Sequence, residues 1–111
     1  MIVWQKSMDL VVAVYELTIG YPNSELYGLV VHTRKTAVSI PSNIAEGRRR
    51  GSKKDYRSFL IVAYSSGAEL ETQIEIAKRL PFGKKLDFKK VDDLLDEVMR
   101  MLNKMTSSLR T

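Results

Sequence analysis

The chain has 111 residues, of which 44% are hydrophobic, and 18 Lys and Arg against 13 Asp and Glu give a net charge of +5. A chain of this length can bury roughly 65% of the surface of its unfolded form, so it needs no disulfide or metal to hold a core. It has no cysteine and one histidine, His32, which excludes thiolate metal sites, cysteine nucleophiles and sites with two imidazoles. Residues 1–7 lack a signal-peptide pattern and no apolar run approaches the ~20 residues of a membrane span, so we expect a soluble, cytoplasmic protein.

The first predicted helix runs from about Lys6 to Ile19. Its apolar residues recur at steps of three and four, the period of one helix face, and Gly20-Tyr21-Pro22 ends the pattern. For Trp4 and Tyr15 we expect burial in the core, with a face for self-association as the alternative. The complete stripe comprises Trp4, Met8, Val11, Val12, Tyr15 and Ile19.

The second predicted helix follows Ser24, which is a plausible N-cap with Glu25 in the first turn. It runs to about Glu46, and Gly47 ends it. Pro41 lies inside this stretch, where its ring crowds a carbonyl and one backbone hydrogen bond is lost. We therefore predict a kinked but continuous helix.

The third predicted helix begins after Ser52, which with Asp55 resembles a capping box, and extends for about 27 residues, or roughly 40 Å. Gly67 within it indicates either the close approach of a neighbouring helix or a neutral small residue. Asp87 can cap the fourth helix, which we expect to fray from Thr106 onward.

The three connections are short, roughly three to seven residues, so successive helices must be antiparallel neighbours. The predicted fold class is therefore all-α, an up-down-up-down four-helix bundle that forms a single domain over residues 1–111. In this topology the first and third connections lie at one end and the second lies alone at the other.

Several motifs stand in a characteristic order along nearly the whole chain. They are Trp4, Tyr15-Glu-Leu-Thr18, Tyr27-Gly-Leu29, Ala37-Val-Ser-Ile-Pro-Ser-Asn-Ile-Ala-Glu-Gly-Arg48, Ser52 and Glu69-Leu-Glu-Thr-Gln73. In this order they resemble the 23S rRNA intervening-sequence protein family.

The resemblance implies a small antiparallel four-helix bundle without a settled molecular activity. It also implies a homo-oligomer, with a pentamer favoured because pentamers occur among the family's members. Some genes of the family lie in inserts within rRNA genes. The chain is also similar to the accessory variability protein of diversity-generating retroelements, a basic pentameric barrel that partners a reverse transcriptase and nucleic acid, which suggests a function by analogy.

Positive charge is concentrated between the second and third predicted helices. Residues 48–57 carry six basic and one acidic side chain, which equals the net excess of the whole protein. Such a cluster suits phosphate, whereas the alternative is a solvated turn that pairs with acidic side chains. Cations near a helix N-terminus are mildly destabilising, so stability alone does not favour Lys53 and Lys54 there. We call this cluster the basic turn and define it as Arg48, Arg49, Arg50, Lys53, Lys54 and Arg57.

A second, weaker basic set surrounds the start of the fourth helix and is diluted by three aspartates. It falls at the opposite end of the predicted bundle, so the two sets should not merge within one subunit. Its members are Lys84, Lys85, Lys89 and Lys90.

Two polar strips recur at helical spacing on the second and third helices. They predict a buried network that fixes the register between helices or between subunits, with an exposed or interface face as the alternative. Such side chains could also satisfy the Ala37 carbonyl that Pro41 leaves without its donor. The predicted network comprises Ser39, Ser42, Asn43, Glu46, Glu69 and Gln73.

No arrangement in the sequence predicts catalysis, a metal or a cofactor. His32 has no Glu at the offset of a di-iron motif, and Ser65-Ser66-Gly67 lies within a helix and lacks a histidine base. The sequence therefore predicts a non-enzymatic, oligomeric protein that binds structured RNA or other nucleic acid through the basic turn by charge and shape. The alternative is a protein-assembly or adaptor module that docks a protein partner without binding nucleic acid.

Overall fold

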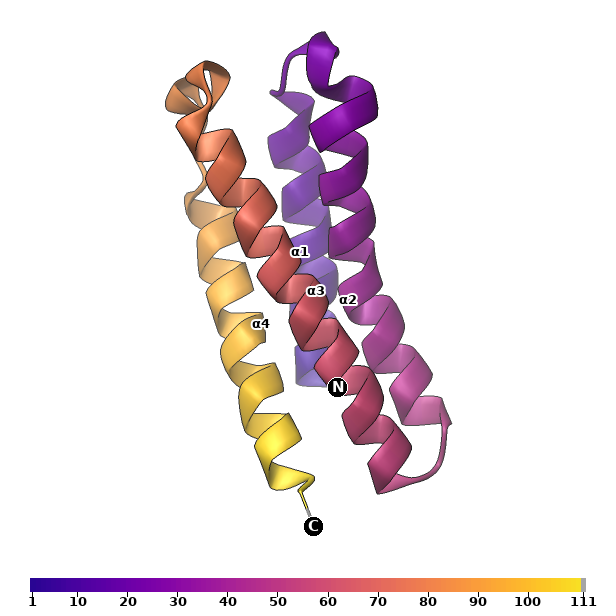
Figure 1. Ribbon diagram of the computed structural model, residues 1–111. Helices are drawn as coiled ribbons and strands as arrows, with labels where there is room; N and C mark the ends of the chain where they lie inside the picture. The colour runs from indigo at the N-terminus through magenta and orange to yellow at the C-terminus, as the bar shows by residue number, and fades with distance from the viewer. Residues whose placement is uncertain (111) are drawn as a thin grey trace.

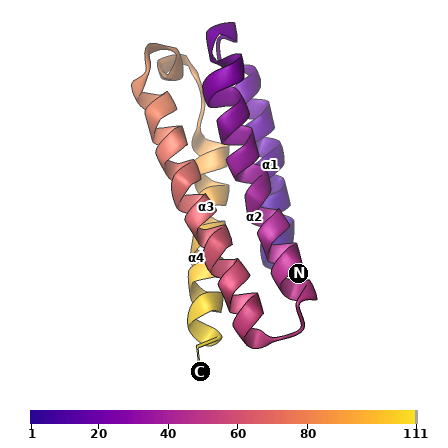
Figure 2. The ribbon, with the colours of Figure 1, turned by 45° about the vertical axis from the view of Figure 1, so that its right-hand side comes forward.

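The computed structural model describes residues 1–110, so that Thr111, the last residue of the predicted domain, lies outside the described residues. Four long helices run alternately up and down (Figure 1). The two views show the α1/α2 and α3/α4 connections at one end and the α2/α3 turn at the other, as predicted (Figure 2). The elements are α1 (Ile2–Ile19), η1 (Asn23–Glu25), η2 (Leu26–Val30), α2 (Val31–Arg49), α3 (Lys53–Arg79), η3 (Pro81–Lys85) and α4 (Lys89–Ser108).

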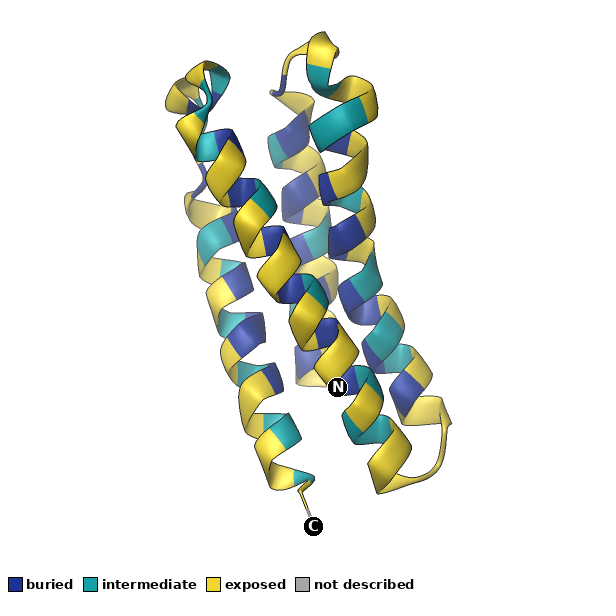
Figure 3. Cartoon of the chain, viewed as in Figure 1, coloured by how far each residue is buried: buried dark blue, intermediate teal, exposed yellow. Residues whose placement is uncertain are grey.

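Each long helix packs against two neighbours, in the cyclic order α1, α2, α3, α4. The bundle is 46 Å long and 23 by 19 Å across. Every helix turns one buried strip toward the axis, bordered by residues of intermediate burial, and leaves its outer side exposed (Figure 3). Leu10, Ile40, Leu70 and Leu102, one from each helix, are wholly buried. Among residues 1–110, no helix is long and apolar enough to span a bilayer.

Helix α1 buries a different face from the one that its stripe predicts. The core side chains are Val3, Ser7, Leu10, Ala13, Val14 and Thr18. Trp4, Met8, Val12, Tyr15 and Ile19 are between 36% and 77% exposed. The expected core burial of Trp4 and Tyr15 is therefore wrong. Because α1 is apolar on two sides, periodicity alone does not decide which side faces the core.

The second helical segment begins and ends differently from the prediction. A turn of 3₁₀-helix and a turn of π-helix precede α2, and Ser24 makes no side-chain cap. The helix is continuous through the buried Pro41, as predicted. Gly47, however, lies inside α2, which ends at Arg49. The residue that turns the chain is Gly51, whose φ of +85° is a conformation that glycine adopts at little cost.

Gly47 instead allows α2 and α3 to approach closely. A Cβ at this position would lie 2.6 Å from the Cβ of Phe59 and 3.3 Å from Cδ1 of Tyr56. Gly67 plays the same part between α3 and α4, because a Cβ there would collide with the sulfur of Met99. Of the two interpretations of Gly67, close helix approach is therefore the correct one.

The predicted Ser52 cap is present, whereas the N-cap residue of α4 is Phe88 and Asp87 stands one residue before it. The Ser52 hydroxyl accepts a hydrogen bond from the backbone N–H of Asp55 at 3.1 Å, and α3 has the predicted 27 residues. The Asp87 carboxylate accepts a bond from the backbone N–H of Lys89 at 2.9 Å. Helix α4 stays helical to Ser108, beyond the predicted start of fraying at Thr106.

Candidate nucleic-acid interface

The basic turn lies at the end of the bundle that carries the α2/α3 connection (Figure 1). Arg48 and Arg49 form the last turn of α2, and Arg50 follows as its C-cap. Lys53 and Lys54 begin α3, and Arg57 stands one turn further along. The positive φ of Gly51 and the Ser52 cap fix the turn between the two helices.

Two of the six cations have partners within the protein. Nε of Arg50 donates to the Glu46 carboxylate at 3.1 Å, and its guanidinium lies 4.8 Å from the centroid of the Phe59 ring. Nε of Arg57, which is half-buried, donates to the Thr106 carbonyl at 2.9 Å. This bond ties the last turn of α4 to α3 and explains why α4 does not fray where expected. These two side chains therefore stabilise the site as well as adding charge.

The other four cations are exposed and make no hydrogen bond or ion pair within residues 1–110. Arg48 and Arg49 lie at the C-terminus of α2, where positive charge interacts favourably with the helix dipole. Lys53 and Lys54 lie in the first turn of α3, where positive charge interacts unfavourably with the helix dipole. Asp55 in the same turn offsets part of this unfavourable interaction. Stability of α3 accordingly does not account for these two lysines.

An apolar groove with an aromatic side chain borders the basic turn. Its volume is about 420 Å³, and its lining comes from the start of α1 and the end of α2. The aromatic side chain is Trp4, which the sequence pattern placed in the core. The apolar character of α1 on both of its sides was the signal that Trp4 could face outward instead. We call this feature the Trp4 groove, and it is lined by Met1, Trp4, Ala45, Arg48 and Arg49.

A second groove opens on the other side of the basic turn, between the start of α3 and the end of α4. Lys54 and Arg57 line it together with Arg110, which sequence reasoning did not include. Arg110 is distant in sequence from the basic turn, so only the antiparallel return of α4 brings it there.

The second basic set lies at the opposite end of the bundle, as predicted (Figure 1). Nζ of Lys89 lies 2.7 Å from the Asp93 carboxylate, and Nζ of Lys90 lies 3.7 Å from that of Glu16. These contacts agree with the prediction that acidic neighbours dilute this set.

The polar residues of α2 mainly bond to their own helix. The side chains of Ser39, Ser42 and Asn43 donate to the carbonyls of Thr36, Val38 and Ser39, at 2.6, 2.8 and 2.7 Å. None of these bonds goes to the Ala37 carbonyl, which we expected such side chains to satisfy.

One side-chain bond joins α2 to the strip of α3, from Nε2 of Gln73 to the hydroxyl of Thr36, which is not among the predicted residues, at 3.0 Å. Glu46 pairs with Arg50, while Glu69 is exposed. Within the described chain the strips thus contribute one contact between helices rather than a network, and a network between subunits remains a prediction.

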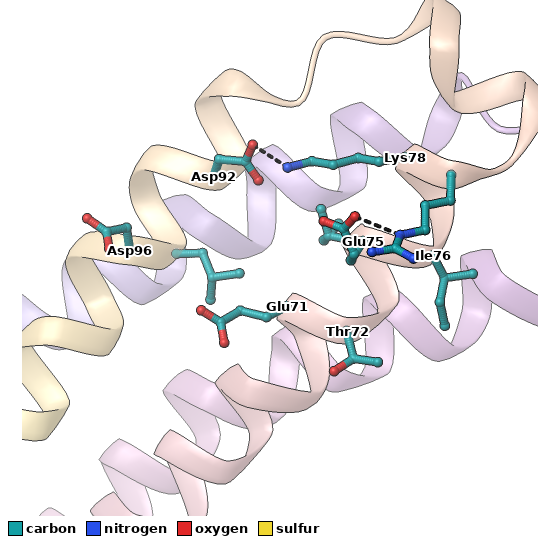
Figure 4. Close-up of a pocket in the computed structure, with 10 residues that line it drawn as sticks. Glu71, Thr72, Glu75, Ile76, Lys78, Asp92 and Asp96 are labelled. Atoms are coloured by element: carbon teal, nitrogen blue, oxygen red, sulfur yellow. Dashed lines mark hydrogen bonds and ion pairs between the residues drawn. The ribbon is translucent and has the colours of Figure 1, made fainter.

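A pocket between α3 and α4 is lined by four acidic residues, Glu71, Glu75, Asp92 and Asp96 (Figure 4). Its charges are largely paired, with Lys78 donating to Asp92 at 2.7 Å and Arg79 donating to Glu75 at 3.0 Å. Lys78 joins α3 to α4, so its ion pair has a structural role. Among residues 1–110, no three His, Cys, Asp or Glu side chains are grouped so as to hold a metal ion.

The fold and the site define a small, basic, four-helix-bundle protein with four exposed, unpaired cations at the turn between α2 and α3. The sequence matches the family model of the 23S rRNA-intervening sequence protein over residues 1–104. The chain therefore belongs to this family, which confirms the resemblance seen in its motifs. The description of the family names no reaction. No curated protein matches the chain.

Proposed function

We propose that this protein is a non-enzymatic, cytoplasmic, oligomeric protein that binds structured RNA or other nucleic acid through the basic turn. The observation that supports this proposal best is the display of Arg48, Arg49, Lys53 and Lys54. All four are exposed, and none is paired within residues 1–110. Four unpaired cations on a short capped turn suit a nucleic-acid backbone, and stability of α3 does not account for the two of them, Lys53 and Lys54, that lie in its first turn.

Binding of this kind rests on electrostatics and counterion release. Each phosphate neutralised by Lys or Arg releases condensed counterions, so affinity falls with salt in proportion to the number of contacts. Arginine forks and lysine point charges both suit phosphate oxygens. The N–H groups at the start of α3 add partial positive charge on the same side.

Self-association is the second part of the proposal, and the outer face of α1 supports it. Met8, Val12, Tyr15 and Ile19 form an exposed apolar strip there, and Val38 of α2 is also exposed. The guanidinium of Arg34 lies 4.5 Å from the Tyr15 ring centroid, which gives the strip an ordered aromatic position. Such a strip on a second side of a helix is typical of a face that another chain covers.

A homo-oligomer repeats the basic turn once per subunit, which raises avidity for a polyanion. The family resemblance favours a pentamer, whose five basic turns would carry roughly 25 net positive charges. The mass of the protein in solution, measured by light scattering, tests this part by itself. A strictly monomeric mass would contradict it.

The binding experiment is a titration of a fluorescent rRNA-like stem-loop and a DNA duplex of equal length across a salt series. The test variant is Arg49→Ala/Lys53→Ala/Lys54→Ala. Its matched control, Lys84→Ala/Lys85→Ala/Lys90→Ala, removes the same charge from the opposite end. We expect steep salt dependence, with a log–log slope on DNA that is shallower by up to about 0.9 per lost contact in the test variant only.

Equal binding by the two variants would show that net charge, not the basic turn, attracts the nucleic acid. If neither ligand binds the unmodified protein at low salt, the nucleic-acid proposal is wrong. That result would support the adaptor alternative, in which the basic turn faces acidic side chains of a protein partner.

A further inference from the structure

The Trp4 groove brings an aromatic ring and two free guanidinium groups together from different helices. Trp4 lies on the first turn of α1, whereas Arg48 and Arg49 lie on the last turn of α2, 44 residues later. All three line the same depression, together with the short side chain of Ala45. Trp4 is 36% exposed, so part of its indole remains open to a ligand.

The dimensions and the chemistry of this groove suit one nucleobase with its flanking phosphates. A volume of about 420 Å³ is within the roughly 300–1,000 Å³ of small-ligand sites. Aromatic side chains beside basic ones are the elements that bind unpaired nucleotides, since a base stacks on the ring while phosphates contact the cations. A base within a continuous duplex is already stacked on both faces and cannot occupy such a site.

We propose that the Trp4 groove holds one unpaired nucleobase of a bound RNA, stacked on Trp4, with its neighbouring phosphates on Arg48 and Arg49. This inference rests on the proposed binding of RNA at the basic turn. It assigns to that site a preference for loops, bulges or single strands over uninterrupted duplex.

A second copy of the chain is the competing occupant, because the apolar strip of α1 continues from Trp4 to Met8. A groove lined by Trp4, Met8, Val38 and Pro41 also lies directly beside the Trp4 groove. Covering the Trp4 groove with an apolar face would, however, bury the two unpaired guanidinium groups, and desolvation of unpaired charge is costly. The neighbouring groove that Met8 and Val38 line has no charged residue among its described lining. Arg48 and Arg49 therefore favour a polyanion in the Trp4 groove. The apolar strip of α1 from Met8 to Ile19 is left for self-association.

Trp4 is the sole tryptophan of the chain, so intrinsic fluorescence reports on this groove directly. The experiment titrates the protein with a single-stranded oligouridylate and with a blunt RNA duplex that has the same number of phosphates. Anisotropy of end-labelled RNA measures binding in parallel. We expect the single strand to quench Trp4 fluorescence with the same midpoint as the anisotropy, and the duplex to leave the fluorescence largely unchanged.

The test variant is Trp4→Leu and the matched control is Tyr64→Leu. Tyr64 is a similarly exposed aromatic residue on α3, outside the strip proposed for self-association. Trp4→Leu should weaken binding of the single strand about tenfold while affinity for the duplex stays the same. Tyr64→Leu should preserve the preference for the single strand.

Failure of this inference differs from failure of the proposed function. Salt-dependent RNA binding without any change in Trp4 fluorescence overturns the groove assignment and leaves binding at the basic turn intact. A Trp4→Leu protein with a reduced assembly mass and an unaltered strand preference also overturns it, because Trp4 then belongs to a subunit interface. Absence of binding to both RNAs overturns both. The quenching measurement uses the unmodified protein, so it decides the question even if Trp4→Leu does not fold.

Discussion

Replacement of Gly47 by alanine should destabilise the protein, although alanine is the better helix former. Inside a helix, Gly→Ala ordinarily gains about 0.5–1 kcal/mol. Here the added Cβ would lie 2.6 Å from the Cβ of Phe59, and 3.3 Å from a ring carbon and the carbonyl oxygen of Tyr56. The Phe59 Cβ is fixed to the α3 backbone, so relief requires α2 and α3 to separate.

Forcing an extra methyl group into a packed contact costs typically about 1–3 kcal/mol. Subtracting the gain in helix propensity leaves a net loss for Gly47→Ala of about 1 kcal/mol at the middle of a range of about 0–2.5 kcal/mol. For a domain of this size the melting temperature should fall by roughly 4–8 °C. Thermal unfolding followed by circular dichroism, together with a denaturant titration, measures both quantities.

Gly28→Ala is the matched control, because the position is helical and the added Cβ would meet only the flexible Glu25 carboxylate, at 3.6 Å. It should raise stability by up to about 1 kcal/mol. If Gly47→Ala were as stable as Gly28→Ala, the close approach of α2 and α3 would be refuted. The basic turn would then not be held by a tight α2/α3 contact.

Three further substitutions test local features of the structure. Ser52→Ala should cost about 1 kcal/mol in the denaturant titration, because it removes the acceptor for the Asp55 N–H, and an unchanged midpoint would contradict the cap. Burial raises the pKa of Tyr21 from 10.0 to about 12, so the unfolded chain releases this proton first and stability should fall between about pH 10 and 12. Tyr21→Phe should lose that part of the pH dependence and keep its stability at pH 7, since the buried hydroxyl has no hydrogen-bond partner within residues 1–110. Asn43→Leu should alter the assembly mass or the melting temperature, and an unchanged value of both would count against a polar network.

The sequence was sufficient to predict those features of the fold that depend on residues close together along the chain. The Ser52 cap, the length of α3 and the alternation of helix directions follow from local periodicity and short connections. It was insufficient where two faces of one helix are equally apolar, as in α1, because only packing decides which is buried. Gly47 shows the same limit, since a glycine at the end of a pattern fits both a helix stop and a close helix contact.

The candidate site shows a similar division between local and distant effects. The six cations of the basic turn are contiguous enough to be found by counting charge. Their different roles depend on residues far along the chain or in space, such as Thr106, whose carbonyl accepts a bond from Arg57. Trp4 was recognised as an aromatic residue of a helical stripe, but its position beside Arg48 follows only from the packing of α1 against α2.

The position of the basic turn constrains how assembly and binding can cooperate. Every α2/α3 turn lies at one end of its bundle, so a cyclic ring whose axis runs along the helices places all copies on one rim. An antiparallel dimer would place them at opposite ends, about 46 Å apart, the length of one bundle. A short RNA loop can engage several turns together in the first arrangement, where each further contact is intramolecular, whereas the second arrangement requires an RNA long enough to span about 46 Å. The apolar strip of α1 runs along the bundle, so a copy that covers it in parallel orientation gives the first arrangement.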